Sequence, residues 1–221
     1  MNNHFSLNGV YIGKAVKRYG LNTGIDKSPI TKSLYLFKEG LAGDECADQQ
    51  HHGGLDRALH QYPIEHYNYW RHKHGETRQW QAPGMGENLS SIGMTENNVC
   101  IGDQYQWGEA IIEVSQPRSP CFKLNNRWGI EGLSLEMQNL SLCGWLYRVL
   151  QPGFVSIHES LILIHRVDNA MTIGEVCELF FGDPLNEEGL LKLQQQSKLS
   201  NSWMSKVSQR LENNTVENWD K

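Results

Sequence analysis

Long hydrophobic runs are absent from this chain of 221 residues. A membrane-spanning helix needs about 18 or more consecutive apolar residues, and no stretch approaches that length, so the sequence predicts no membrane span. The first residues, 1–6, contain no basic segment followed by a long apolar one, and we therefore expect no signal peptide.

An excess of positive charge is also missing. The chain has 20 Lys and Arg against 25 Asp and Glu, a formal net charge of −5 at pH 7. Proteins that hold nucleic acid by bulk charge are basic, so this composition excludes that class of binder. A local site for an anion remains compatible with it.

Cysteine is sparse, and no two cysteines form a Cys-x-x-Cys pair. Five widely spaced cysteines argue against both a disulfide framework and a zinc ribbon, and they predict a reduced, cytoplasmic protein. These residues are Cys46, Cys100, Cys121, Cys143 and Cys177.

Short segments of alternating apolar residues, separated by Gly, Asp and Asn, make up most of the first three quarters of the chain. This pattern predicts strands. Because few helices interrupt them, we expect a mainly β (α+β) fold with a β-barrel-like domain rather than a doubly wound sheet. The strands are predicted at 10–16, 33–37, 99–101, 110–115 and 160–167.

Two helices are predicted within this barrel-like part. Pro63 suits the first turn of a helix that runs through Trp70. Leu133, Met137 and Leu140 repeat at helical spacing in a second helix over 130–140.

The last quarter of the chain predicts three short helices. Thr172 and Glu175 form a capping-box pattern at the start of the first. Leucines at 190–193 mark the second, and Asn201 or Ser202 is expected to cap the third.

These patterns predict a barrel domain over 1–167, a helical extension over 168–213 and a fraying polar tail over 214–221. The extension has no glycine-rich loop and is acidic. We therefore expect the barrel to hold any ligand alone, and the helices to supply a packing face and a docking surface.

Residues 115–124 are the segment richest in chemically active side chains. Cys121 lies in an extended stretch bounded by Pro117 and Pro120, between Arg118 and Lys123. Positive neighbours favour the thiolate, which binds soft metals and attacks electrophiles. The pattern predicts a metal ligand or a nucleophile and does not choose between them.

A second segment, residues 51–63, combines paired glycines with Arg57. Glycines let a ligand approach the backbone closely, and a guanidinium suits phosphate. Two other interpretations are a structural Asp56–Arg57 ion pair and a zinc site that uses three histidines of this segment, His51, His52 and His60.

A third segment, residues 84–90, places Asn88 after a pair of glycines. It matches neither a P-loop nor a dinucleotide-binding fingerprint.

Together, these segments resemble the MOSC domain, named after the C-terminal domain of molybdenum cofactor sulfurase. The resemblance rests on motifs in the same order, and the tail resembles the three-helix extension of the YiiM-like subgroup. The motifs are Gly43-Asp44-Glu45, the run from His52 to Leu59, Gly86-Glu87-Asn88-Leu89, and the run from Gln116 to Leu124.

The resemblance implies a domain that binds the molybdenum–pterin cofactor and does not use pyridoxal phosphate. It implies reduction of N-hydroxylated compounds, such as hydroxylaminopurines and amidoximes, as a detoxification, with electrons from a flavoprotein reductase. A homodimer is allowed, and no nucleic acid or membrane is implied as a partner. Cys121 is implied as the molybdenum ligand and catalytic residue, and the residues expected to hold the pterin and its phosphate are Arg57, Asn88, Arg118, Ser119 and Lys123.

Two other functions remain open from the sequence. A cofactor carrier or sulfur-transfer module would need Cys121 and the pterin site but no substrate pocket. A cysteine-dependent hydrolase would use Cys121 with His52 or His60 as its base.

Overall fold

The computed structural model describes residues 3–217, and a nine-stranded sheet dominates it. In order across the sheet, the strands are β1 (His4–Phe5), β14 (Leu161–His165), β10 (Gln104–Trp107), β11 (Ala110–Pro117), β12 (Trp145–Gln151), β8 (Leu59–Pro63), β9 (Leu89–Ser91), β2 (Leu7–Ile12) and β5 (Ser28–Pro29).

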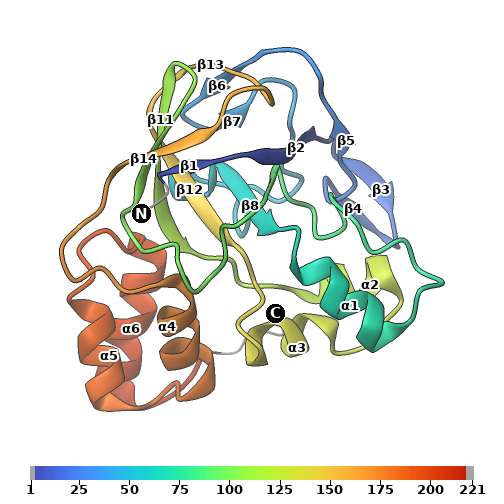
Figure 1. The fold of residues 1–221 in the computed structure, drawn as a ribbon. Coiled ribbons are helices and arrows are strands. Elements are labelled where there is room, and N and C mark those ends of the chain that lie inside the picture. The colour runs from blue at the N-terminus through green and yellow to red at the C-terminus, as the bar shows by residue number, and fades with distance from the viewer. Residues whose placement is uncertain (1–2, 218–221) are drawn as a thin grey trace.

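The N-terminal segment closes this sheet on itself. β1 pairs with β14, while β2 pairs with β9 and β5. Only Ser6 separates β1 from β2, so one nearly continuous segment joins strands from opposite ends of the sheet order (Figure 1). The result is a barrel, as the sequence predicts, and a closed sheet of this kind removes most exposed strand edges.

Two smaller sheets and one 3-10 turn complete the barrel part, and one π-helical turn lies in the tail. One sheet has the order β13 (Gly153–Val155), β6 (Leu34–Phe37) and β7 (Gly40–Leu41), and the other pairs β3 (Val16–Arg18) with β4 (Leu21–Thr23). A 3-10 turn, η1 (Leu55–Arg57), precedes β8, and a π-helical turn, η2 (Glu178–Gly182), follows α4.

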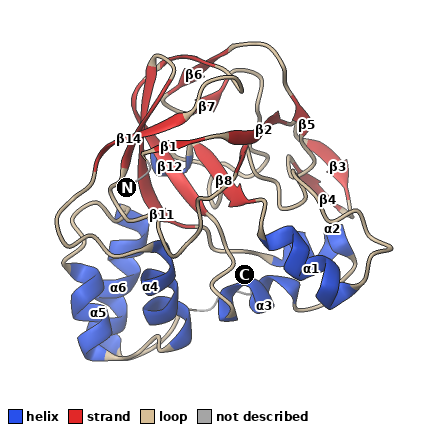
Figure 2. Ribbon diagram, viewed as in Figure 1, coloured by secondary structure: helices blue, strands red, loops and turns tan. Residues whose placement is uncertain are grey.

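The helices lie below the barrel in two groups (Figure 2). Among residues 3–217, no helix is both long and apolar enough to span a bilayer. One group holds α1 (His66–His74), α2 (Phe122–Trp128) and α3 (Leu133–Asn139), and the other holds α4 (Ile173–Cys177), α5 (Glu187–Gln194) and α6 (Asn201–Asn213).

Two predicted strands differ from the structure. The strand expected over 10–16 ends at Ile12, because the next backbone N–H groups bind side chains instead: Gly13 N donates to Asp44 Oδ1 and Ala15 N to Glu45 Oε2. The strand expected over 99–101 is a turn that makes a single bridge to Thr172.

The prolines also behave differently from the prediction. Pro63 is the last residue of β8, opposite Ser91 of β9, and the helix begins only at His66. Pro117 continues β11 and pairs with Trp145, so the strand runs further than 110–115. The segment predicted to stay extended then forms α2 directly after Cys121.

The helical tail follows the prediction more closely. The Thr172–Glu175 capping box is present. The cap of α6 is Ser200, whose Oγ accepts from Trp203 N, rather than Asn201 or Ser202. In the predicted polar tail, 214–221, residues 214–217 are described and lie outside the last helix, and the Glu217 carboxylate pairs with Arg210 at 2.9 Å. Residues 218–221 lie outside the described residues, and fraying of the tail stays a prediction.

One hydrophobic core runs through both the barrel and the tail. Barrel residues such as Leu36 and Trp107 belong to the same buried cluster as Ile173, Phe180 and Trp203 of the tail. The predicted boundary at residue 167 therefore crosses a shared core. A second cluster lies under α1–α3, where Trp80 stacks on Trp128 with 3.9 Å between ring centroids.

Candidate functional site

Cys121 lies at the junction of β11 and α2. It is the residue that precedes the first turn of α2, and its backbone is extended. Its thiol is free and half-buried. The Sγ atom lies 3.9 Å from Nε2 of His52, so the fold brings the 115–124 and 51–63 segments together.

Asp48 gathers polar groups beside this thiol. Its carboxylate lies 3.1 Å from His51 Nδ1 and 3.5 Å from Lys123 Nζ. Burial alone would raise the pKa of Asp48, but hydrogen bonds from His51 and the charge of Lys123 hold that pKa at about 2. Asp48 is therefore anionic at neutral pH and forms an ion pair with Lys123.

His52 is neutral under the same conditions. Partial burial and the charges of Lys123 and Arg118 lower the pKa of His52 to about 4. The positive charge near the thiol at pH 7 therefore belongs to Lys and Arg side chains and not to an imidazolium.

Arg118 has spare hydrogen-bonding capacity. Its backbone N–H donates to Gly144 O at 3.0 Å, which ties the segment to the start of β12. Its Nη1 is buried and lacks a hydrogen-bond partner, and no ion pair among residues 3–217 involves this guanidinium. An unpaired buried donor costs about 1–3 kcal/mol, so a ligand that accepts from it gains a favourable contact.

The charge of Arg118 affects the pKa values of two buried groups, Glu87 and His60. Glu87 accepts hydrogen bonds from Tyr67 Oη and Met85 N. Burial raises the pKa of Glu87 to about 7, against the opposing charge of Arg118. Burial and then Arg118 lower the pKa of His60 well below its usual value, and Nε2 of this neutral ring has no partner.

Asn88 is already saturated by protein groups. Its Oδ1 accepts from His60 N at 3.1 Å, and its Nδ2 donates to Tyr11 O and to Asp44 Oδ2 at 3.2 and 2.7 Å. Asp44 in turn pairs with Lys27. These contacts hold β8, β9 and β2 together under the site, and direct binding of pterin by Asn88 stays a prediction.

Arg57 does not pair with its neighbour in sequence. Asp56 binds Arg148 at 2.6 Å instead, so the interpretation of an Asp56–Arg57 ion pair is wrong. The Arg57 guanidinium donates to the carbonyl of His51 and to Ser202 Oγ, the latter at 3.2 Å. Both acceptors are neutral, which leaves the positive charge of Arg57 available to an anion.

The zinc interpretation fails on geometry. Within residues 3–217, no three His, Cys, Asp or Glu side chains are grouped so that they could hold a metal ion. His51 and His52 lie on the exposed loop, whereas His60 is buried in β8.

The remaining donors suit a bulky anionic group that carries a soft metal. They comprise a free thiol, three cations (Arg57, Arg118 and Lys123) and two buried nitrogen atoms without partners, Arg118 Nη1 and His60 Nε2. A thiolate is a ligand for soft metals, and Arg and Lys side chains bind phosphate. These residues therefore fit a molybdenum–pterin cofactor. Ser119 is half-buried two positions before Cys121, and its role stays a prediction.

Glu87 belongs to the motif Gly86-Glu87-Asn88-Leu89 but was not among the residues expected to hold the cofactor. Carboxylates are almost never fully buried without a partner, and the partner Tyr67 Oη reaches Glu87 only in the folded chain, so no local pattern in the sequence signals its burial.

Comparison with known proteins gives two family matches that together cover most of the chain. Residues 48–161 match the MOSC domain, and residues 171–214 match the YiiM-like 3-alpha helix domain. "Protein YiiM" of Escherichia coli (strain K12) is 41% identical over 215 residues, which cover 96% of this chain and 95% of that protein. A protein named "Reductase" from Gibberella moniliformis is 40% identical over 148 residues, which cover 66% of this chain but only 26% of that protein.

Solved structures agree with these matches. The crystal structure of YiiM from Escherichia coli has a TM-score of 0.84 and 37% identity, and the match covers 98% of this chain and 96% of that one. YiiM from Geobacillus stearothermophilus has a TM-score of 0.79 and 29% identity, with coverages of 94% and 99%. The chain therefore belongs to the MOSC domain family and carries the YiiM-like three-helix domain.

Proposed function

We propose that this protein is a molybdenum-cofactor-dependent reductase that converts N-hydroxylated compounds to the corresponding amines or amidines. The observation that carries the proposal is the free, half-buried thiol of Cys121 in the same segment as Lys123 and Arg118, whose buried Nη1 lacks a partner. In this proposal Cys121 is the molybdenum ligand, because a thiolate is the soft donor that such a metal accepts.

The chain's own residues bind and orient the group. Arg57, Arg118 and Lys123 offset the negative charge of a phosphate-bearing pterin locally, although the whole chain is acidic. Asp48 pairs with Lys123 at 3.5 Å and so fixes the position of that cation. When bound, the molybdenum cofactor supplies the two-electron redox chemistry.

The overall reaction needs two electrons from an external donor. One N–O bond breaks, two electrons and two protons are consumed, and one amine or amidine and one water are released. A flavoprotein reductase is the electron donor we propose. Support for redox chemistry comes from the fungal relative named "Reductase", which shares part of this chain.

The test uses protein purified from a host that makes the molybdenum cofactor. We expect bound molybdenum and pterin by metal and pterin analysis, and reduction of a hydroxylaminopurine by a small chemical reductant. Cys121→Ser should lose both the metal and turnover. Cys46→Ser is the matched control, since Cys46 is also free and half-buried.

Three outcomes contradict the proposal in different ways. Full turnover by Cys121→Ser with molybdenum retained overturns the ligand assignment. Bound cofactor without any turnover of N-hydroxylated compounds favours the carrier or sulfur-transfer module. A chain that takes up no molybdenum–pterin overturns the proposal as a whole.

The 3.9 Å contact between Cys121 and His52 also raises the hydrolase alternative. A general base works best when its pKa lies near the working pH. The pKa of His52 at about 4 makes it a weak base for a thiol, so this contact favours hydrolysis only weakly. Hydrolysis of activated esters by metal-free protein, abolished in Cys121→Ser, would support that alternative over the reductase.

A further inference from the structure

The three-helix tail reaches the candidate site through Arg57. This guanidinium has two hydrogen-bond acceptors in the structure, His51 O in the loop before η1 and Ser202 Oγ in α6. No carboxylate among residues 3–217 forms an ion pair with Arg57. The carboxylate next to it in sequence, Asp56, is bound to Arg148 instead. Two neutral contacts therefore set the direction in which Arg57 presents its charge.

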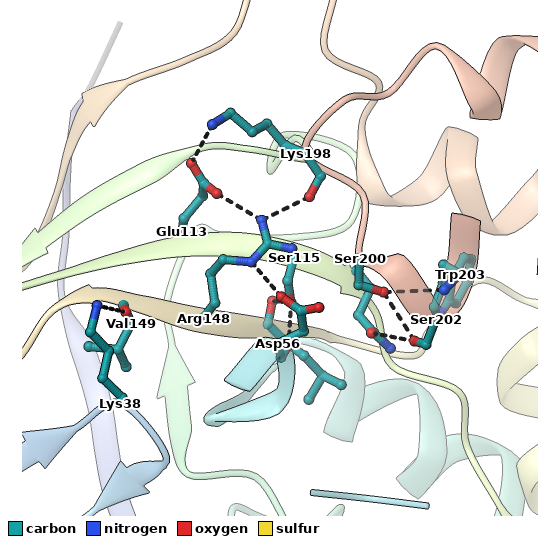
Figure 3. A network of polar contacts seen from close by, with 12 residues as sticks. Lys38, Asp56, Glu113, Ser115, Arg148, Val149, Lys198, Ser200, Ser202 and Trp203 are labelled. Atoms are coloured by element: carbon teal, nitrogen blue, oxygen red, sulfur yellow. Dashed lines mark hydrogen bonds and ion pairs between the residues drawn. The ribbon is translucent and has the colours of Figure 1, made fainter. Parts of the chain in front are cut away.

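The Ser202 hydroxyl connects the tail to both cation-bearing segments. It accepts from Arg57 Nη2 at 3.2 Å and donates to Gln116 Oε1 at 3.4 Å. Gln116 lies in β11, two residues before Arg118. The hydroxyl of Ser200 lies 3.2 Å from that of Ser202 and completes this set of contacts (Figure 3).

The start of α6 is fixed against the barrel by backbone and buried contacts. Ser200 N donates to Ser115 O at 2.9 Å, and the Ser115 hydroxyl binds the carbonyls of Asp56 and Leu146 at 2.6 and 3.0 Å. Trp203, 1% exposed, stacks on Phe180 with 4.0 Å between ring centroids. Ser202 is therefore held in place by the contacts of α6 with β11 and with Phe180, and not by the site loop.

Arg148 adds a second connection a short distance away. Its guanidinium binds Asp56 and Glu113 at 2.6 and 2.8 Å and also the carbonyl of Lys198 at 3.0 Å (Figure 3). Asp56 is thereby held away from Arg57, while the segment before α6 is attached to β12. Both effects help to keep the Arg57 guanidinium within hydrogen-bonding distance of the Ser202 hydroxyl.

We infer that Ser202 is a positioning residue that orients Arg57 towards the anionic part of the bound cofactor, so that the three-helix tail completes the site. The inference rests on the proposed function for the identity of the ligand. It departs from the sequence-based expectation that the barrel holds the ligand alone. That expectation came from the composition of the tail. Composition gives no information about a hydrogen bond between the Ser202 hydroxyl and Arg57, which lies 145 positions earlier.

The first test measures how fast loaded protein loses its cofactor. Ser202→Ala removes the acceptor for Arg57, and the loss of one hydrogen bond of ordinary net strength predicts roughly two- to tenfold faster release of molybdenum and pterin during dialysis. Ser202→Thr, which keeps the hydroxyl, should restore slow release. Ser205→Ala, an exposed serine on the same helix, is the matched control and should resemble the wild type.

A merely structural role would lower the melting temperature of Ser202→Ala and would not be rescued selectively by threonine. We expect equal melting temperatures for cofactor-free Ser202→Ala and Ser205→Ala. Release from Ser202→Ala at the wild-type rate overturns the inference.

The second test needs no cofactor. The guanidinium NMR signals of Arg57, assigned with Arg57→Lys, should show restricted rotation in the wild type and averaging in Ser202→Ala. Unchanged Arg57 signals in Ser202→Ala overturn the positioning role while the proposed function stands. A wild-type chain that binds no molybdenum–pterin overturns the proposed function and the ligand assigned to Arg57, even if the signals change as expected.

Discussion

At the scale of single residues, Arg118 is the side chain with the most unused binding capacity. Its buried Nη1 has no hydrogen-bond partner among residues 3–217. Arg118→Met keeps much of the side-chain volume and removes the charge. Loss of a charged hydrogen bond costs roughly 1.5–3 kcal/mol, so affinity for the cofactor should fall about ten- to a hundredfold.

Equilibrium cofactor occupancy, measured at several cofactor concentrations, checks this prediction. Arg71→Met on α1 is the control, because that guanidinium binds Asn68 and the Trp80 carbonyl, away from Cys121. Equal occupancy in Arg118→Met and wild type would mean that Arg118 serves the fold alone.

A second prediction concerns Glu87 and the dependence of folding stability on pH. Burial raises its pKa from 4.5 to about 7 in the folded protein. Between these values the folded state holds a proton that the unfolded state releases, so this group's contribution to stability is full below pH 4.5 and is lost as the pH rises to 7. Over that interval the loss is about 3 kcal/mol.

Chemical denaturation of wild type and Glu87→Gln at pH 5 and pH 7.5 isolates this effect, since other titrating groups are common to both proteins. The stability of wild type relative to Glu87→Gln should decrease by about 2–3 kcal/mol from the lower to the higher pH. A difference that does not change with pH would show that Glu87 keeps an ordinary pKa.

At the scale of elements, the capping box of α4 gives a prediction about a helix start. Thr172 Oγ1 accepts from Glu175 N at 3.2 Å, and Glu175 Oε2 accepts from Thr172 N at 2.7 Å. Thr172→Ala should lower the free energy of unfolding by about 1 kcal/mol. Thr31→Ala, in an exposed loop, is the control and should leave the denaturation midpoint unchanged.

The elements also show what can be predicted from sequence. Strands with dense β-branched residues, such as β11 and β14, are predictable because the residues of each strand alone are typical of a core strand. β8 is not, since it buries the polar residues His60 and Gln61, and the side chain of Gln61 finds its partners, Ser91, Met94 and Tyr147, far away in the sequence. α2 is not predictable either, because only Leu124 among its residues is buried, so it shows no periodic apolar face in the sequence.

The site divides in the same way. The sequence marks Cys121 as a candidate because its cationic neighbours lie within three residues of it. The Arg57–Ser202 contact joins residues 145 positions apart, and the effect of Arg118 on Glu87 arises only when the end of β11 and the start of β9 fold into one barrel, since Arg118 follows β11 and Glu87 precedes β9. Such contacts and charge effects depend on tertiary structure that local patterns do not encode.

At the scale of the whole molecule, the shared core makes the barrel and the tail one cooperative unit. Trp203 is 1% exposed and packs in the same cluster as the barrel strands. Trp203→Ala should therefore destabilise the whole chain by about 3–5 kcal/mol and not the tail alone. Far-ultraviolet circular dichroism and tryptophan fluorescence should report the same single transition.

Phe154→Ala is the control, since that ring is 54% exposed on β13. Two separated transitions in Trp203→Ala, one for the helices and one for the barrel, would contradict a common core.

The way the barrel closes has a consequence for biosynthesis. His4 in β1 pairs with Ile162 in β14, so the first strand made needs a partner that is among the last of the barrel. At roughly 5–20 residues per second on the ribosome, β1 waits about 8–30 s for that partner. During this interval the nascent chain exposes open strand edges on both sides of the unfinished sheet, which is the condition under which chaperones recognise a growing polypeptide.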